Sequence, residues 1–250
     1  MGMGLVFPFM TWAAPSFTNI TDQDMKDIAE GMGANFTHNS MMGASKLGDV
    51  FGFQVGLVGA QTSTKEIADI IERSGGSGVD SLYNAGVMAA VGIPFGLSFE
   101  VVSMPTYKSD DAKAASSSAA IKLNMNDMIP ILPVNLALRG VSSSAEFKFT
   151  QSGATISDKT TVTGVQLLLS PMIPIVEPYV GVGSLSSKTE LKTTGSSIFS
   201  GSTLLEDSKT VTGIQYLAGV EVSLLFLKFG AEYSTAFGNS RTGVKLSFGF

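Results

Sequence analysis

The chain has 250 residues, of which 15% are charged, and its 16 basic and 21 acidic side chains leave a net charge of −5. Ordinary soluble domains carry about 25% charged residues, so this composition is unusual for a cytosolic protein. The negative charge and the absence of a Lys/Arg cluster argue against nucleic acid as a partner. The sequence has no cysteine, so disulfides cannot stabilise the fold.

The first 48 residues differ from residues 49–250, and we interpret them as a tail and a helix in front of one β-domain. Met1 to Thr21 is uncharged but is interrupted by Pro8 and Pro15, and it lacks the basic start of a secretory signal. We therefore interpret the chain as a mature one whose signal peptide has been removed. Thr21 and Asp24 resemble a capping box and predict an amphipathic helix over residues 22–32.

The apolar side chains of the tail and the predicted helix would form a large exposed patch in water, so they must pack against another apolar surface. A lumen of about ten strands offers little space for a helix roughly 10 Å across, so we expect that surface to lie outside the barrel. The predicted lipid or subunit contacts are Phe7, Phe9, Trp12, Met25, Ile28 and Met32. A second short helix is predicted between Ser63 and Gly75, with Ile67, Ile70 and Ile71 on one face.

From residue 51 onward, apolar and polar residues alternate in about ten segments, as β-strands require. The segment from Ser81 to Phe99 is uncharged, but its period is near two and it contains Gly86, Gly92 and Pro94, so it is not a membrane helix. The segments cover residues 51–57, 85–91, 97–101, 121–125, 134–138, 165–169, 176–182, 214–220, 227–233 and 244–250.

Two kinds of connection alternate along these segments. Short apolar turns contain Ile93-Pro94, Ile129-Pro130 and Ile173-Pro174, whereas polar stretches cover residues 61–80, 107–118, 142–159, 184–209 and 237–241. This pattern predicts an antiparallel up-and-down barrel with short turns at one end and long loops at the other. The stretch from Asp158 to Gln166 returns 49 residues later from Asp207 to Gln215, which indicates hairpin duplication.

Alternation alone does not distinguish a membrane barrel from a soluble β-sandwich. Aromatic residues on the apolar face of the strands favour the transmembrane barrel, because such barrels carry aromatic girdles. The last strand resembles the terminal signal of bacterial outer-membrane β-barrel proteins, with alternating Val244, Leu246, Phe248 and terminal Phe250. This resemblance implies a bacterial outer-membrane location, contact with membrane lipid, insertion by the barrel assembly machinery, and both termini in the periplasm.

The stretch from Tyr83 to Leu97, after the N-terminal helix, is similar to the family of the predatory outer membrane protein of Bdellovibrio. That resemblance implies homo-oligomeric rings that enclose lipid. Small residues let membrane elements approach closely. The candidate subunit contact is therefore the wall formed by Ala85, Val87, Ala89 and Val91.

The opposite face of the strands carries four acidic and four basic residues, which we expect to point into the lumen and to pair with one another. A barrel of about ten strands is then closed or nearly closed. The alternative is a selective pore. The predicted network consists of Glu100, Lys122, Arg139, Glu177, Glu221, Lys228, Glu232 and Lys245.

Inward glycines are expected to relieve crowding in a small barrel; the alternative is that they make room for a plug. They are Gly52, Gly56, Gly86, Gly164, Gly181, Gly183 and Gly230.

Catalytic and cofactor sites find little support in this sequence. The single histidine, His38, lies among polar residues before the barrel, and we expect it at the surface. No metal-ligand spacing or cofactor motif occurs, and the acidic pair Asp110-Asp111 is expected to be solvated. We therefore expect a non-enzymatic outer-membrane protein with a structural or lipid-associated role. The alternatives are a narrow channel or transporter for small or apolar solutes, with the N-terminal helix as plug, and a soluble adhesin or lectin.

Overall fold

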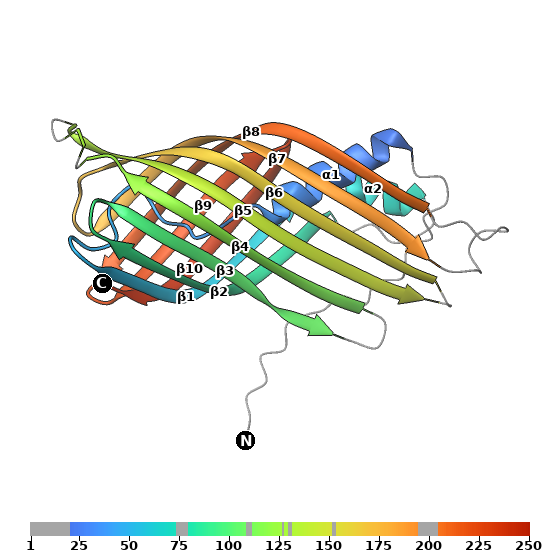
Figure 1. The fold of residues 1–250 in the computed structure, drawn as a ribbon, viewed down its shortest axis with the longest axis horizontal. Helices are drawn as coiled ribbons and strands as arrows, with labels where there is room; N and C mark the ends of the chain where they lie inside the picture. Colours follow the sequence, from blue (N-terminus) through green and yellow to red (C-terminus); the bar gives the residue numbers. More distant parts are fainter. Residues whose placement is uncertain are drawn as a thin grey trace, which may run out of the picture.

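In the computed structural model, ten antiparallel strands close into one barrel (Figure 1). The structure describes residues 21–73, 80–108, 112–126, 128–129, 132–151, 154–194 and 205–250. The helices are α1 (Asp22–Phe36) and α2 (Lys65–Arg73). The strands are β1 (Gly52–Ser63), β2 (Ser81–Ile93), β3 (Leu97–Lys108), β4 (Ala112–Asn124), β5 (Val134–Gln151), β6 (Ala154–Pro171), β7 (Val176–Thr194), β8 (Leu205–Leu224), β9 (Leu227–Ala236) and β10 (Asn239–Gly249).

Each strand pairs with its neighbours in sequence, and β1 pairs with β10 to close the barrel. At this seam, the backbone N–H of Phe53 donates to the carbonyl of Phe250, and the N–H of Phe250 donates back, both at 3.0 Å. The two rings also meet edge to face, with centroids 4.6 Å apart. The prediction of a closed up-and-down barrel of about ten strands with an N-terminal helix is therefore confirmed.

The barrel wall is apolar on the outside and polar on the inside. On β7, Val180 and Val182 are 52% and 43% exposed, whereas Tyr179, between strand neighbours that face outward, is only 2% exposed. The C-terminal strand alternates in the same way, and its outward residues Val244, Leu246, Phe248 and Phe250 are all exposed. This distribution is the reverse of the one that a soluble sandwich needs.

Aromatic side chains mark both ends of this wall. Phe95 and Phe226 are exposed in two of the short turns, and Tyr83 of β2 and Tyr233 of β9 are exposed nearer the other end of their strands. In the part of the chain that the structure describes, neither helix is long and apolar enough to cross a bilayer.

Strands β5 to β8 are 18 to 20 residues long and include much of the sequence predicted as polar loops. The prediction of long loops at 107–118, 142–159 and 184–209 is therefore wrong in large part. For example, the segment from Ser142 to Ser144 pairs in regular register with the segment from Thr163 back to Thr161 on β6. These segments carry Ser and Thr on their outer face, so the apolar alternation that identifies a strand fades although the hydrogen-bonded ladder continues.

Helix α1 lies inside the barrel, so the expectation that it packs outside is wrong. It contacts strands around the barrel, β6, β7, β8 and β10 among them, and its residues Ala29 and Ala34 share a buried cluster with inward residues of the wall. A helix is roughly 10 Å across only when its side chains are of ordinary size. This helix instead presents small residues, such as Gly33, to a wall that is also lined by small residues, such as Ser187.

The chain passes through the lumen from one end to the other. Helix α1 begins at the end where α2 lies, opposite the C-terminus (Figure 1). From Phe36, residues 37–48, here called the luminal segment, continue toward the short turns, and β1 starts there at Gly52. We call the end where α1 begins the loop end, and the end where β1 starts the short-turn end. The described chain therefore starts at the loop end, not on the side of the short turns where both termini were expected.

At the short-turn end, the luminal segment rests on a pair of glycines. Gly52 and Gly92 are direct partners across β1 and β2, and the carbonyl group of Leu47 lies against both. A Cβ at Gly230 would lie 3.0 Å from Cε of Lys245 and 3.4 Å from the carbonyl oxygen of Met41. At these positions the inward glycines make room for the chain in the lumen. Gly164, in contrast, lies against Leu185 of the neighbouring strand.

We predict that Gly92→Ala loosens the luminal segment. The new Cβ would lie 2.9 Å from the carbonyl carbon of Leu47, and overpacking of this kind costs about 1–3 kcal/mol. Hydrogen exchange at residues 43–48 should rise in the folded protein. Gly59→Ala is the matched control, because a Cβ there meets nothing within 4 Å. Equal exchange in the two variants would contradict the prediction.

Candidate functional site

The luminal segment is buried but forms neither helix nor strand, so its backbone needs hydrogen-bond partners from elsewhere. Inward side chains of the wall supply them. Four donors each reach a different carbonyl oxygen: Arg241 reaches Thr37 (2.7 Å), Lys245 reaches Met41 (2.6 Å), Lys122 reaches Gly43 (2.8 Å) and Asn124 reaches Ala44 (2.7 Å).

Met41 is the point of highest backbone cost in this segment. Its φ is +50°, in the left-handed region, although it is not a glycine, and its side chain is fully buried. Such a conformation costs roughly 1–2 kcal/mol for a residue with a Cβ. The bond from Lys245 Nζ to the Met41 carbonyl offsets part of that cost, so a wall cation holds the residue with the strained backbone.

The first ion cluster surrounds Glu100, whose side chain is buried. Its carboxylate lies 3.6 Å from Arg139 and 3.8 Å from Lys122, and it accepts a 2.6 Å hydrogen bond from Ser40 of the luminal segment. Arg139 also donates to Ser40. The cluster therefore joins β3, β4 and β5 to the luminal segment through one carboxylate.

Two further clusters lie on β7 to β10. Glu221 pairs with Lys245 and, at 3.4 Å, with Lys228. Glu232 lies 3.9 Å from Arg241 and accepts a 2.9 Å hydrogen bond from the hydroxyl of Tyr179.

The remaining acid of the predicted network, Glu177, binds the luminal segment without a cation as its donor. It accepts from the backbone N–H of Ser45 at 2.9 Å and from the hydroxyl of Ser170 at 2.7 Å. All eight predicted luminal charges thus point inward. Three of them, Lys122, Glu177 and Lys245, contact the backbone of the luminal segment directly.

Sequence reasoning missed two charged or titratable members of this network. Arg241 was assigned to a turn, although it lies four residues before Lys245 on β10 and alternation places both on the same face. His38 was expected at the surface, and that expectation is wrong, because His38 is 2% exposed and lies between Ser118 and Glu100. Its inward position comes from the path of the luminal segment, which has no periodicity to indicate it.

The duplicated hairpins meet inside the barrel. Gln166 and Gln215 occupy equivalent positions of the repeat, and the amide of Gln166 donates to the carbonyl oxygen of Gln215 at 2.5 Å. Arg139 donates to Gln166 from the other side at 2.6 Å. Val162 and Val211, also equivalent in the repeat, share the apolar cluster around α1. The repeat therefore preserves inward-facing positions.

At the loop end, α1 is fixed by charges at its first turn. Thr21 and Asp24 form the predicted capping box, Asp24 lies 2.5 Å from Arg73 of α2, and Asp22 lies 2.7 Å from Lys209 of β8. Burial acts to raise the pKa of Asp24, but hydrogen bonds from Thr21 and Arg73 outweigh it and hold that pKa below its ordinary value. Asp24 is therefore ionised at neutral pH, as an N-terminal cap requires.

The chain Ser118–His38–Glu100 has the connectivity of a nucleophile, a base and an acid, with distances of 2.9 and 3.2 Å. Of these three residues, Ser118 lines a gap of about 20 Å³, together with Phe36, Thr37 and other strand residues. A gap of that size holds about one water molecule and no ester or peptide substrate. Glu100 is also engaged by two cations, so the arrangement anchors the luminal segment.

The remaining predicted site residues lie on α1 or outside the described residues. Met25 and Ile28 are buried, 1% and 7% exposed, within the helix that fills the lumen, so they do not contact lipid. Met32 is half-buried on the same helix. Phe7, Phe9, Trp12 and the pair Asp110-Asp111 lie outside the described residues. Among the described residues, no three His, Asp or Glu side chains are grouped to hold a metal ion.

We predict that Glu100→Ala destabilises the folded protein by about 3–5 kcal/mol, because it leaves Arg139 and Lys122 buried without their anion. The free energy of unfolding would be measured by guanidinium titration in phospholipid vesicles. Glu146→Ala removes a carboxylate of an exposed ion pair with Lys148 and should cost about 0–1 kcal/mol. Similar losses in the two variants would show that the Glu100 cluster does not anchor the fold.

Several solved barrels are similar to this chain at low identity. The attachment invasion locus protein Ail of Yersinia pestis has 12% identity and a TM-score of 0.35, and the match covers 81% of this chain and 100% of that one. The translocator domain of the autotransporter NalP from Neisseria meningitidis has 10% identity and a TM-score of 0.39, with coverage of 80% and 87%. These TM-scores are too low for either likeness to bear on what this chain does.

No curated protein matches this sequence significantly. A family model does match, and it covers residues 14–248, which include α1, the luminal segment and all but the last residue of β10. The chain belongs to the family of unknown function DUF6588.

Proposed function

We propose that the chain is an integral, non-enzymatic β-barrel protein of the bacterial outer membrane whose lumen is closed by its own N-terminal segment. The observation that carries this proposal is the combination of an apolar outer wall with a lumen filled by α1 and the luminal segment. In a bilayer every backbone group must be paired, and a closed sheet without edges meets that demand. In this arrangement the wall faces lipid, and α1 and the luminal segment pack against its inner face.

The orientation is inferred from the two longest connections, between β1 and β2 and between β7 and β8, which both join strands at the loop end. In outer-membrane barrels, the short turns face the periplasm and the longer connections face outward. The same orientation places the start of α1, at Asp22, on the outer surface of the cell, and Asp49 at the periplasmic mouth. The chain then runs inward through its own barrel before its first strand begins.

Single cysteines test insertion and orientation together, because the natural sequence has none. We predict that Asp22→Cys reacts with a membrane-impermeant maleimide on intact cells, since its side chain is 86% exposed at the loop end. Asp49→Cys should react only after the outer membrane is permeabilised. Val180→Cys, on the lipid-facing wall, should react in neither case. Labelling of Val180→Cys in intact cells would refute insertion, and a reversed order of the other two would refute the orientation.

A plugged channel is the second candidate, and one observation favours it. Within the described residues, the luminal segment is bound to the wall by side-chain hydrogen bonds and forms no ladder with a strand. Its release from the lumen would break these side-chain hydrogen bonds but no strand pairing. The residues it would uncover are polar and charged, as the lining of an aqueous path is.

The closed lumen predicts that the full-length protein gives no conductance steps in a planar bilayer. A variant that lacks residues 22–44 should conduct, provided that its heat-modifiable migration on a gel shows a folded barrel. Large, ion-selective steps from the full-length protein that change with Arg139→Ala or Glu232→Ala would overturn the closed form and support the channel.

A ring of identical copies is a separate proposal. The outward residues of β2 that support it are small or short, with Ala85, Val87, Ala89 and Val91 in sequence. The enclosed position of α1 removes the described helix from the contacts available to a second copy. A strictly monomeric native mass in mild detergent would exclude the ring.

A further inference from the structure

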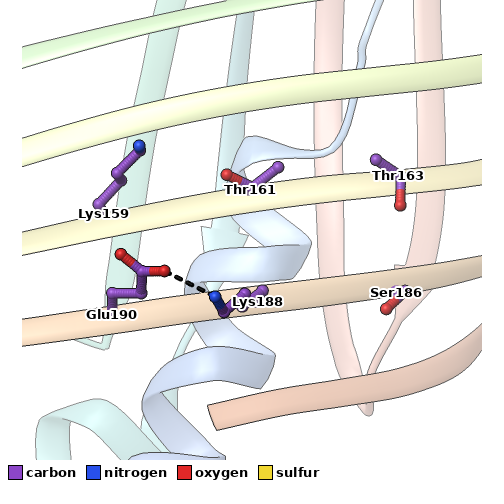
Figure 2. A pocket seen from close by; sticks show the side chains of 6 residues that line it. All are labelled: Lys159, Thr161, Thr163, Ser186, Lys188 and Glu190. Atoms are coloured by element: carbon purple, nitrogen blue, oxygen red, sulfur yellow. Dashed lines mark hydrogen bonds and ion pairs between the residues drawn. The ribbon is translucent and has the colours of Figure 1, made fainter. Parts of the chain in front are cut away.

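A polar hollow lies on the outer face of the wall, between β6 and β7. Its volume is about 220 Å³, and six side chains line it (Figure 2). Lys159, Thr161 and Thr163 come from β6, and Ser186, Lys188 and Glu190 come from β7. Their inward neighbours on each strand are buried, as Thr160 and Ser187 are, so the six face away from the lumen.

The hollow lies just beyond the apolar part of the wall. Along β7 the outward residues are apolar from Val176 to Val182 and polar from Ser184 onward, and Lys188 is twelve residues from Val176. With a rise of about 3.3 Å per residue and a tilt of about 40°, Lys188 lies roughly 30 Å from the start of the wall. The apolar band of such barrels is about 25 Å tall, so the hollow is at the level of the lipid headgroups.

The charges of the hollow are suited to an anion. Lys188 pairs with Glu190 at 2.7 Å, and Figure 2 shows this contact as the one ion pair drawn among the six residues. Lys159 is opposite Glu190 in the register of β6 with β7 and opposite Glu146 in the register of β5 with β6. Within the described residues it forms no direct ion pair, but its charge acts on Glu190. Three hydroxyl groups, from Thr161, Thr163 and Ser186, flank the two cations.

We propose that this hollow binds the phosphate of a phosphorylated glycolipid in the outer leaflet. Lys159 and Lys188 would bind the phosphate as charged donors, and the hydroxyl groups would bind its remaining oxygens or a sugar hydroxyl. Glu190 opposes the anion and holds Lys188 in place until the lipid is bound. The proposal rests on the outer-membrane insertion proposed above and assigns a lipid class to one face of that barrel.

The test measures binding of diphosphorylated lipid A to the full-length protein in mild detergent by native mass spectrometry. The double variant Lys159→Gln/Lys188→Gln should weaken binding by roughly tenfold, since two charged hydrogen-bond donors are lost. Glu190→Gln should strengthen it, because that change frees Lys188 and removes a repelling charge. A role in wall stability alone would not produce this opposite sign.

The matched control is Lys26→Gln/Lys65→Gln, which removes two exposed lysines from α1 and α2 that do not line the hollow. It should leave binding unchanged, and an equal loss would show diffuse surface attraction in place of a site. Equal binding of the dephosphorylated lipid, or full competition by inorganic phosphate, would also overturn the proposal. Heat-modifiable migration and the cysteine labelling report insertion separately, so a failure of the barrel proposal can be told from a failure of this one.

Discussion

The structure depends on the need to bond every polar backbone group inside a lumen that is filled by the chain itself. The wall meets this demand through its own ladders, but residues 37–48 have no ladder of their own. The inward cations therefore do more than neutralise the inward acids. Arg241, Lys245 and Lys122 each donate to a carbonyl of the segment while a nearby glutamate stabilises their charge. A buried cation without that carboxylate would cost several kcal/mol.

The same constraint explains the small residues of the lumen. A helix and an extended segment share the barrel with large charged side chains, and their backbones approach the wall closely. Gly33 lies against Ser187, and Gly52 and Gly92 lie against the carbonyl of Leu47. Bulk in the lumen is thus supplied by the N-terminal segment, whereas the wall supplies donors, acceptors and gaps. A barrel of this size without such a segment would be lined by the same charges with water between them.

Most of the fold could be predicted because strand alternation is a local signal. Leu227 to Tyr233 and Val244 to Phe250 identify their strands and their outward faces without knowledge of any partner. The same alternation of inward and outward side chains places Glu100 and Lys245 inside the barrel. Two features could not be predicted in this way. The Ser- and Thr-rich strand extensions, such as Ser142 to Ser144, do not differ in polarity between their faces. His38 lies in a segment whose path is set by tertiary contacts alone. The position of α1 inside the barrel could not be predicted, because the width of a helix depends on which of its residues face the wall.

The seam between β1 and β10 has a consequence for the order of assembly. The two strands that close the barrel are the first and the last in the chain, and each contacts α1. As long as β10 is unpaired, the sheet is an open trough into which the N-terminal residues can settle sideways. Once Phe250 bonds to Phe53, entry would require threading a helix along the axis past Arg241 and Lys245. Packing of α1 and the luminal segment before β10 docks would avoid that threading, so the position of the seam favours an order in which the interior fills first and the wall closes last.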